Sequence, residues 1–563
     1  MLPLDAFHQI VAPVAGSLPV SALVAAVPLV VLFVLLGVFK APAWASSVAT
    51  LCVCVLLSVV GWRMPAGQAL SATAEGVFFG ACQIMWILIA ALWLYNLTVT
   101  LGWDAVLRGI LRGISDDLRV LSLLVAFAFG ALLEGLAGFG APVAIAAAML
   151  ASTGMPKLKA AAVAMVGNTA PVTFGAIGAP ITALGTAAAS AGLGGGSDPS
   201  VLAVAFGVMG GRQSPVVAIL VPLFILAIVD GKRGLKDCWP VALVCGLAFA
   251  AAQFVCASYL SYMITDIVAG VFCLLVMLVL LRFVQPGHPM RAEAGEDQES
   301  TPGPAHNATG AARIWGALAP YAIIVALFSL SQLPPVKTWV SSTLTTIFTW
   351  PGLNECKNSA GTASCVSTGI NLYSVLSSGC YLALGALITT VVYRMTWKRS
   401  LGVLGETIAS LRFTIVTIAA VLGIAYVMNA SGMTISLGTA LASAGAAFAF
   451  VSPVLGWLGV AITGSDTSSN ALFGGMQVVA AQQVWPGSVP HEILMATSNS
   501  TGGGMGKMIS PQSLSVAAAA VDLPNKEGEI FRRVLGWSVS LLIIVAVLVT
   551  LQATVLTGMI PVP

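Results

Sequence analysis

Long apolar stretches alternate with short polar ones along nearly the whole chain. Each of the longest stretches approaches or exceeds the ~20 residues that an α-helix needs to cross ~30 Å of hydrocarbon. They lie near residues 20–40, 43–61, 79–100, 201–229, 238–258, 263–283, 313–333, 371–393, 403–428 and 534–559. The pattern therefore predicts an all-α polytopic membrane protein.

Composition supports this prediction, because 58% of the 563 residues are hydrophobic and only 8% are charged. A soluble chain of this length needs a far more charged surface. No basic residue precedes Lys40, so we expect no cleaved signal peptide. One segment is not membrane-like: VQPGHPMRAEAGEDQESTPGPAHNATG, beginning at Val284, is rich in Pro, Gly and acids. It is typical of a solvated linker and divides the chain into two similar halves.

The two halves resemble each other at a constant spacing. Asn168 and Thr169 precede Asn499 and Ser500 by 331 residues, and the same offset relates Gly175 to Gly506. Further matches at this offset are Pro180 with Pro511, Tyr95 with Tyr426 and Glu75 with Glu406. The stretch EGLAGFGAP from Glu134 corresponds to GSDTSSNALFG from Gly464. These matches in similar apolar surroundings predict an internal duplication.

Basic residues give the orientation of the halves, because cytoplasmic loops carry an excess of Lys and Arg. We assume that the N-terminus is outside and that each of the two Gly-rich polar stretches forms the tip of a re-entrant hairpin. Most of the 24 Lys and Arg residues, among them Arg119, then fall in inside loops, and only Arg63, Lys337 and Lys357 fall outside. The halves become an inverted-topology repeat with about twelve crossings, two hairpins and both termini periplasmic.

This topology defines three regions. Residues 1–260 form the first repeat, with a hairpin near 119–154 and a broken helix near 158–190. Residues 261–312 hold a connecting helix and the polar cytoplasmic linker. Residues 313–563 form the second repeat, and its hairpin and broken helix are expected near 450–485 and 489–520. Cys356 and Cys365 then lie in the same external loop, where the oxidising environment would allow them to form a disulfide.

Polar and helix-breaking residues interrupt both predicted broken helices, in GNTAPVTFGAIGAP from Gly167 and SNSTGGGMGKMISPQ from Ser498. A broken helix exposes N–H groups and a partial positive charge at the start of its second part, which suits a carboxylate. The amides, hydroxyls and glycine backbone that we expect to bind substrate are Asn168, Thr169, Gly175, Ser468, Asn470, Asn499, Ser500 and Thr501. The alternative is that these residues only cap the broken helices.

Ionisable residues inside a membrane are costly and therefore point to function. Glu134 and Asp466 lie in the two predicted hairpin tips. Partial desolvation favours the protonated form of a carboxyl group, so both are candidate proton carriers. The alternatives are a wetted tip residue for Glu134 and a helix cap for Asp466. Lys507 directly follows the second break, where it either attracts the anion or pairs with Asp466. Arg212 is a weaker candidate, and His491 is given no role.

Several motifs resemble the bacterial lactate permease family: EGLAGFGAPVAI, NTAPVTFGAIGAPI, VDGKRGLKDCWP, GSDTSSNALFGG and TGGGMGKMISPQS. The resemblance runs from the first crossing to the C-terminus. It implies import of L-lactate, D-lactate and glycolate together with protons. The two-hairpin repeat also resembles the wider ion-transporter superfamily. Where lactate permeases usually have the sequence ANTTGG, this chain has SNSTGG from Ser498, a difference that bears on substrate preference.

The sequence thus predicts a secondary transporter of the bacterial inner membrane, not an enzyme. Its expected partners are a small 2-hydroxy acid anion and the lipid bilayer, with no nucleic acid. The proton is the coupling ion, and no cofactor or metal is expected. Sodium coupling within the same architecture is the alternative, because Asn, Ser and Thr oxygens at helix breaks also suit Na⁺. The choice between monomer and homodimer is open.

Overall fold

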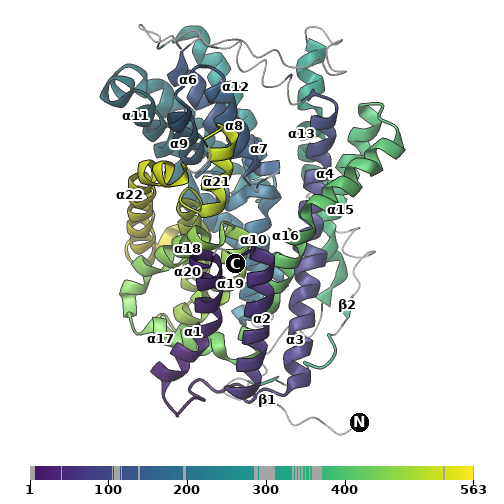
Figure 1. The fold of residues 1–563 in the computed structure, drawn as a ribbon, viewed down its shortest axis with the longest axis vertical. Helices are drawn as coiled ribbons and strands as arrows, with labels where there is room; N and C mark the ends of the chain where they lie inside the picture. The colour runs from purple at the N-terminus through teal and green to yellow at the C-terminus, as the bar shows by residue number, and fades with distance from the viewer. Residues whose placement is uncertain are drawn as a thin grey trace.

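A computed structural model describes residues 7–561, except 40, 104–105, 107–114, 116, 137, 139, 194–197, 285–289, 291–310, 332–334, 337–338, 340–342, 344–346, 349, 354–355, 358–369 and 524–525. Almost all of the described chain is helical, and most helices run along the long axis of the molecule (Figure 1). Within the described residues, ten helical segments are long and apolar enough to cross a membrane. The prediction of an all-α polytopic membrane protein is confirmed, and the number of crossings stays a prediction.

The first half contains sixteen described helical elements. They are α1 (Leu18–Phe33), η1 (Val34–Val38), α2 (Ala43–Val60), α3 (Ala66–Phe79), η2 (Gly80–Met85), α4 (Trp86–Thr100), α6 (Leu118–Ser122), η3 (Leu123–Phe129), α7 (Gly130–Leu136), α8 (Ala141–Ala151), α9 (Lys157–Gly167), η4 (Val172–Phe174), α10 (Gly175–Ser190), α11 (Pro199–Val255), η6 (Cys256–Leu260) and α12 (Thr265–Phe283).

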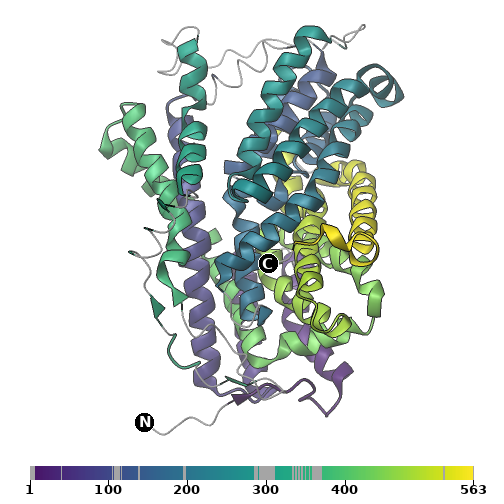
Figure 2. The same cartoon turned by 180° about the vertical axis from the view of Figure 1, so that it is seen from behind.

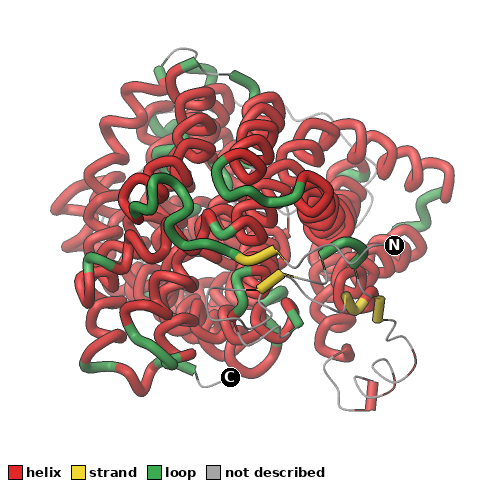
Figure 3. The backbone as a smooth tube through the Cα atoms, turned by 90° about the horizontal axis from the view of Figure 1, so that it is seen from below, coloured by secondary structure: helices red, strands yellow, loops and turns green. Residues whose placement is uncertain are grey.

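The helices of the second half follow after the linker region. They are α13 (Ala311–Ser331), α15 (Leu372–Val392), α16 (Trp397–Ser431), α17 (Met433–Ala442), η8 (Gly445–Ala447), α18 (Phe448–Thr463), α19 (Asp466–Val484), α20 (Val489–Lys507), α21 (Pro511–Ala520), α22 (Glu527–Thr554) and η9 (Thr557–Met559). Two-residue strands pair as β1 (Phe7–His8) with β3 (Cys356–Lys357), parallel, and β2 (Ile347–Phe348) with β4 (Ile370–Asn371), antiparallel. In the view from below of Figure 3 the two strand pairs lie in separate places. The proposed Cys356–Cys365 disulfide lies outside the described residues.

Each half contains a long helical segment, and these two segments have the same length. The continuous helical segments Ala66–Thr100 and Trp397–Ser431 have 35 residues each, and both ends differ by the predicted offset of 331. These segments pack side by side and antiparallel. A methyl group on Gly76 would stand 2.5 Å from the carbonyl oxygen of Leu422, while further along Trp93 Nε1 donates to the carbonyl oxygen of Ser400 at 3.0 Å. The close crossing at Gly76 therefore depends on the missing side chain.

Two helix–turn–helix units occupy the predicted hairpin positions. The first hairpin consists of α6, the π-helix η3, α7 and α8, and the second consists of α18 and α19. Each hairpin packs its second helix on the other half, because α8 contacts α21 while α19 contacts α10. In Figure 1 the element α6 lies toward the upper end and α17, which leads to α18, toward the lower end. The halves are thus interlocked rather than merely adjacent.

Arg119 was predicted to lie in a loop, but it lies in helix α6. Its side chain is 0% exposed in the first turn of α6, where Asp117, Asp230 and Asp237 surround it at nitrogen–oxygen distances of 2.8, 3.2 and 3.2 Å. Asp230 stands at a kink of α11 where Gly231 adopts φ 60°. Three carboxylates offset the cost of burying one guanidinium, so this cluster fixes the base of the first hairpin against α11.

We expect the substitution Gly76→Ala to lower the thermal stability of the purified protein. The new methyl group would collide with backbone of α16, and overpacking of this kind costs about 1–3 kcal/mol. Gly405→Ala on α16 is the matched control, because its methyl group meets no atom within 4 Å. Thermal unfolding in detergent measures both variants, and equal melting temperatures would contradict the close crossing.

Candidate functional site

A small cavity at the meeting point of both hairpins and the first broken helix collects the ionisable residues predicted for the site. Its volume is about 30 Å³, and α10, α19 and α20 around it lie near mid-height in Figure 1. The residues that line it are Glu134, Gly138, Val172, Gly175, Ala176, Pro180, Gly464, Ser465, Asp466, Thr467 and Lys507. Of these residues, the sequence predicts Glu134, Gly175, Asp466 and Lys507 as part of the site, and it does not predict the others.

The first broken helix is interrupted where the sequence predicts. Helix α9 ends at Gly167, and regular helix resumes only after Ala176, Ile177 and Gly178, whose φ angles of 44°, 56° and 70° are left-handed. Two of these residues carry side chains, and a left-handed conformation costs such residues roughly 1–2 kcal/mol each. The surrounding contacts must hold this strained turn in place, as is usual at functional sites.

Glu134 and Lys507 form the central ion pair. Glu134 lies in the last turn of α7, and Lys507 is the last residue of α20, so the two halves each contribute one charge. Both residues are buried: Glu134 is 2% exposed and Lys507 is 8% exposed. Asn168 Nδ2 donates to the other carboxylate oxygen of Glu134 at 2.9 Å. Of the two alternatives given for Lys507, the ion pair is formed with Glu134 and not with Asp466, and attraction of the anion stays a prediction.

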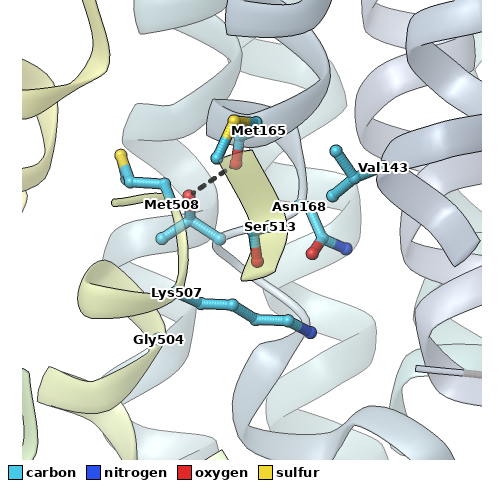
Figure 4. Close-up of a pocket in the computed structure, with 8 residues that line it drawn as sticks. Val143, Met165, Asn168, Gly504, Lys507, Met508 and Ser513 are labelled. Carbon is cyan, nitrogen blue, oxygen red and sulfur yellow. Dashed lines mark hydrogen bonds between the residues drawn. The ribbon is translucent and has the colours of Figure 1, made fainter. Parts of the chain in front are cut away.

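Gly175 provides the room for this carboxylate. A methyl group at Gly175 would stand 2.7 Å from Oε1 of Glu134, closer than real contacts allow. Figure 4 shows Lys507 extended away from α20 toward the segments of the first half, with Asn168 in the same region. Thr169 is buried in the turn after α9, and its hydroxyl donates to two carbonyl oxygens of α9, those of Met165 at 3.4 Å and Val166 at 2.7 Å.

Asp466 opens α19 on the opposite wall of the cavity. The cap of this helix is Ser465, which accepts from the Ser468 amide, so Asp466 is not needed as a cap. Ser500 donates its hydroxyl hydrogen to Oδ2 of Asp466. The other oxygen, Oδ1, is buried and has no partner among the described residues. The spacing from Asp466 to Ser500 equals that from Glu134 to Asn168, namely 34 residues.

The second broken helix differs from the prediction. Helix α20 continues through Asn499, Ser500 and Thr501 to Lys507, and the interruption comes only at Met508–Ser510, before α21. The helix ends facing the cavity therefore belong to α10 and α19, not to α10 and α21. The glycines that suggested a break instead allow close packing, since a methyl group on Gly502 would stand 2.1 Å from the Pro453 carbonyl oxygen of α18.

Several predicted substrate ligands are occupied in hydrogen bonds away from the cavity. Asn499 accepts from Gln477 at 2.7 Å and donates to Asn470 at 2.8 Å, while Asn470 also donates to the Pro180 carbonyl oxygen at 3.0 Å. Thr501 donates to Gln213 at 2.9 Å. Ser468 is buried but does not line the cavity. These side chains are arranged as structural links.

Two further residues of the sequence analysis lie away from the site. Arg212 donates to the carbonyl oxygen of Met559 near the C-terminus, so it does not reach the cavity. His491 stacks on Trp485 with a centroid distance of 4.7 Å and contacts the Ser488 hydroxyl at 2.7 Å. No group of three His, Cys, Asp or Glu side chains suitable for a metal ion occurs in the described part of the chain.

A multi-pass helical bundle that encloses a charged cavity between two interlocked halves defines a membrane transport protein. The sequence profile of the L-lactate permease family matches residues 21–556, and the chain belongs to this family. It is 37% identical to the L-lactate permease of Bacillus subtilis, over 98% of this chain and 99% of the relative. It is also 37% identical to the glycolate permease GlcA of Escherichia coli, over 97% and 98%.

Among solved structures, the chain is similar to the YdaH transporter of Alcanivorax borkumensis, with 15% identity, a TM-score of 0.40 and coverage of 86% of each chain. The family membership identifies the protein as a permease and not an enzyme.

Asn168 and Asn499 occupy equivalent positions in the two halves and allow a matched test. We expect Asn168→Ala to reduce transport with a small effect on melting temperature, because Asn168 contacts Glu134 at the cavity. Asn499→Ala should instead destabilise the protein by roughly 1–3 kcal/mol, because it leaves Gln477 and Asn470 unpaired in the interior. Counterflow in liposomes and thermal unfolding measure the two effects. The division of roles is refuted if both variants behave alike.

Proposed function

We propose that the protein imports a small 2-hydroxy monocarboxylate, L-lactate and with it D-lactate and glycolate, in symport with protons across the bacterial inner membrane. The names of the similar permeases, for L-lactate and for glycolate, support the substrate class. The observation that carries the mechanism is the buried ion pair between Glu134 and Lys507 in a cavity that also holds Asp466.

The substrate carboxylate and Glu134 compete for the same ammonium group. A proton on Glu134 removes its negative charge and releases Lys507, which can then bind the carboxylate of the substrate. The empty carrier, with the ion pair, and the carrier loaded with both proton and anion hold the same net charge. A carrier with only one of the two holds an uncompensated buried charge, which costs several kcal/mol. Proton and anion therefore bind and move together.

Asp466 supplies the remaining recognition. Asp466 lines the same cavity as Lys507, and its carboxyl group, whose oxygen Oδ1 has no partner among the described residues, would accept a hydrogen bond from the 2-hydroxyl group once the hairpins separate. The cavity of about 30 Å³ has room for about two water molecules and not for lactate. Binding of lactate would therefore require the hairpins to separate.

Alternating access follows from the relation between the halves. The antiparallel packing of the equal segments Ala66–Thr100 and Trp397–Ser431 supports an inverted-topology repeat. The distribution of Lys and Arg supports the orientation with both termini periplasmic. In this arrangement the first hairpin enters from the cytoplasm and the second from the periplasm. Movement of the hairpins and α10 against the long helices would open the cavity to one side at a time.

The variant Glu134→Gln tests the coupling. A permanently neutral side chain leaves Lys507 unpaired in the empty carrier, so only the substrate-loaded carrier can reorient. We expect accumulation of lactate under a pH gradient to fall at least about tenfold, while exchange of labelled for unlabelled lactate continues. Both are measured in sodium-free liposomes.

Glu492→Gln is the matched control for this experiment, because Glu492 is a buried carboxyl of α20 that contacts Gln482 at 2.9 Å outside the cavity. This variant should accumulate lactate as the unaltered protein does. Undiminished accumulation by Glu134→Gln would show that Glu134 is not the coupling group.

The role of Asp466 predicts selectivity for 2-hydroxy acids. Propionate, which lacks only the hydroxyl group of lactate, should compete roughly tenfold less well than L-lactate in counterflow, because the hydrogen bond to the buried carboxyl group of Asp466 is lost. Asp466→Ala should reduce this difference in competition between propionate and L-lactate. If propionate and L-lactate compete equally in the unaltered protein, Asp466 does not bind the hydroxyl group of the substrate.

A further inference from the structure

A pair of helices, formed by part of α11 and by α12, packs against the first broken helix on the side away from the cavity. The part of α11 after the kink at Gly231 and the helix α12 run side by side, and Figure 2 shows them together in teal. The turn that joins them reaches the left-handed segment. Tyr262 in this turn lies 3.1 Å from the Thr182 hydroxyl, and its ring would clash with a methyl group on Gly178 at 2.7 Å.

Asp266, in the first turn of α12, is a buried acid that the proposed transport mechanism does not use. The residue is 0% exposed, and its Cβ lies 3.2 Å from where a methyl group on Gly135 would stand, so it packs directly behind Glu134. Gln253 of α11, also 0% exposed, donates to Oδ1 of Asp266 at 3.1 Å. The same amide nitrogen donates to the carbonyl oxygen of Ala170, in the first break, at 3.4 Å.

Two acceptor atoms of this pair are left over. Oδ2 of Asp266 and Oε1 of Gln253 are both buried and have no hydrogen-bond partner in the described part of the chain. Two oxygens cannot satisfy each other unless one of them carries a hydrogen. A proton on Oδ2 would supply that hydrogen and join the carboxylic acid and the carboxamide through two hydrogen bonds.

The charges around Asp266 also favour a neutral acid. The titratable groups that face it from the neighbouring elements, among the described residues, are Glu134 of α7, Lys507 of α20 and Cys256 of η6. The cation among them, Lys507, is already paired with Glu134. A second carboxylate would therefore stand uncompensated in a low-dielectric interior.

We propose that Asp266 holds a proton at neutral pH and that this proton completes a two-way hydrogen bond with Gln253, which ties the first broken helix to α12. Asp266 is a positioning residue, because it acts on the cavity through Gln253, Ala170 and the packing against Gly135. Loss of the proton at alkaline pH leaves a charge that water must reach, and the link opens. The effect on transport rests on the proposed function, whereas protonation of Asp266 does not.

Asp266→Asn tests this proposal, because an amide side chain has both the donor and the acceptor of the protonated acid. We expect exchange of lactate at neutral pH to stay within about twofold of the unaltered protein, and Asp266→Ala to lose about tenfold or more. The infrared band of a protonated carboxylic acid should be weaker by one group in Asp266→Asn, a change that a purely structural role would not produce.

The pH profile gives the second readout. Exchange is measured in the Glu134→Gln background, where Glu134 cannot titrate, with and without Asp266→Asn. We expect exchange to fall at alkaline pH in this background, and the fall to disappear when Asp266→Asn is added, because the link can no longer lose its proton. A fall that persists, an unchanged infrared band, or a loss in Asp266→Asn as large as in Asp266→Ala would each overturn the proposal.

The two proposals fail in different ways. If Glu134→Gln still accumulates lactate under a pH gradient, the coupling role of Glu134 is wrong, and the infrared result for Asp266 stands unaffected. If Asp266→Ala does not fold, Asp266→Asn alone decides, through its infrared spectrum and its exchange at neutral pH.

Discussion

The arrangement of this protein depends on placing one ammonium group among several carboxyl groups inside a hydrocarbon-like interior. Lys507 is paired with Glu134, and Asp466 and Asp266 lie around the same pair. Electrostatic energy in such surroundings penalises every unbalanced charge, so the site can hold only a few combinations of protons and anions. Glu134 also stands near the C-terminal end of α7, where the helix dipole disfavours a negative charge, and Lys507 compensates for it.

The polypeptide geometry around the pair serves this constraint. Gly175 leaves room for the Glu134 carboxylate, and three consecutive left-handed residues turn the chain so that α10 begins at the cavity wall. On the opposite wall Ser465 caps α19, so Asp466 is not needed as a cap and lines the cavity. Polar residues one helical turn further away, such as Asn499 and Thr501, bind other buried side chains and hold these walls in register.

Much of this site could be predicted from the sequence, because a membrane makes every charge and every interruption conspicuous. Glu134, Asp466 and Lys507 stand out in apolar surroundings, and the offset of 331 brings their segments into correspondence. The second break was misplaced for a physical reason. Glycines weaken a helix, but they also permit close helix packing, and Gly502 serves the latter purpose against α18. Asp266 was missed because it begins a long apolar run and belongs to no repeated motif. The burial of Arg119 could not be foreseen, because its partners Asp230 and Asp237 follow more than a hundred residues later.

The exchange of helices between the halves has a consequence for biogenesis. Helix α8 packs on α21 and α19 on α10, so each hairpin completes its contacts only with a partner from the other half. During synthesis the first hairpin, with Glu134 at its end, is inserted long before α20 delivers Lys507. Until then its carboxyl group must stay protonated or hydrated, because an uncompensated charge is costly in lipid.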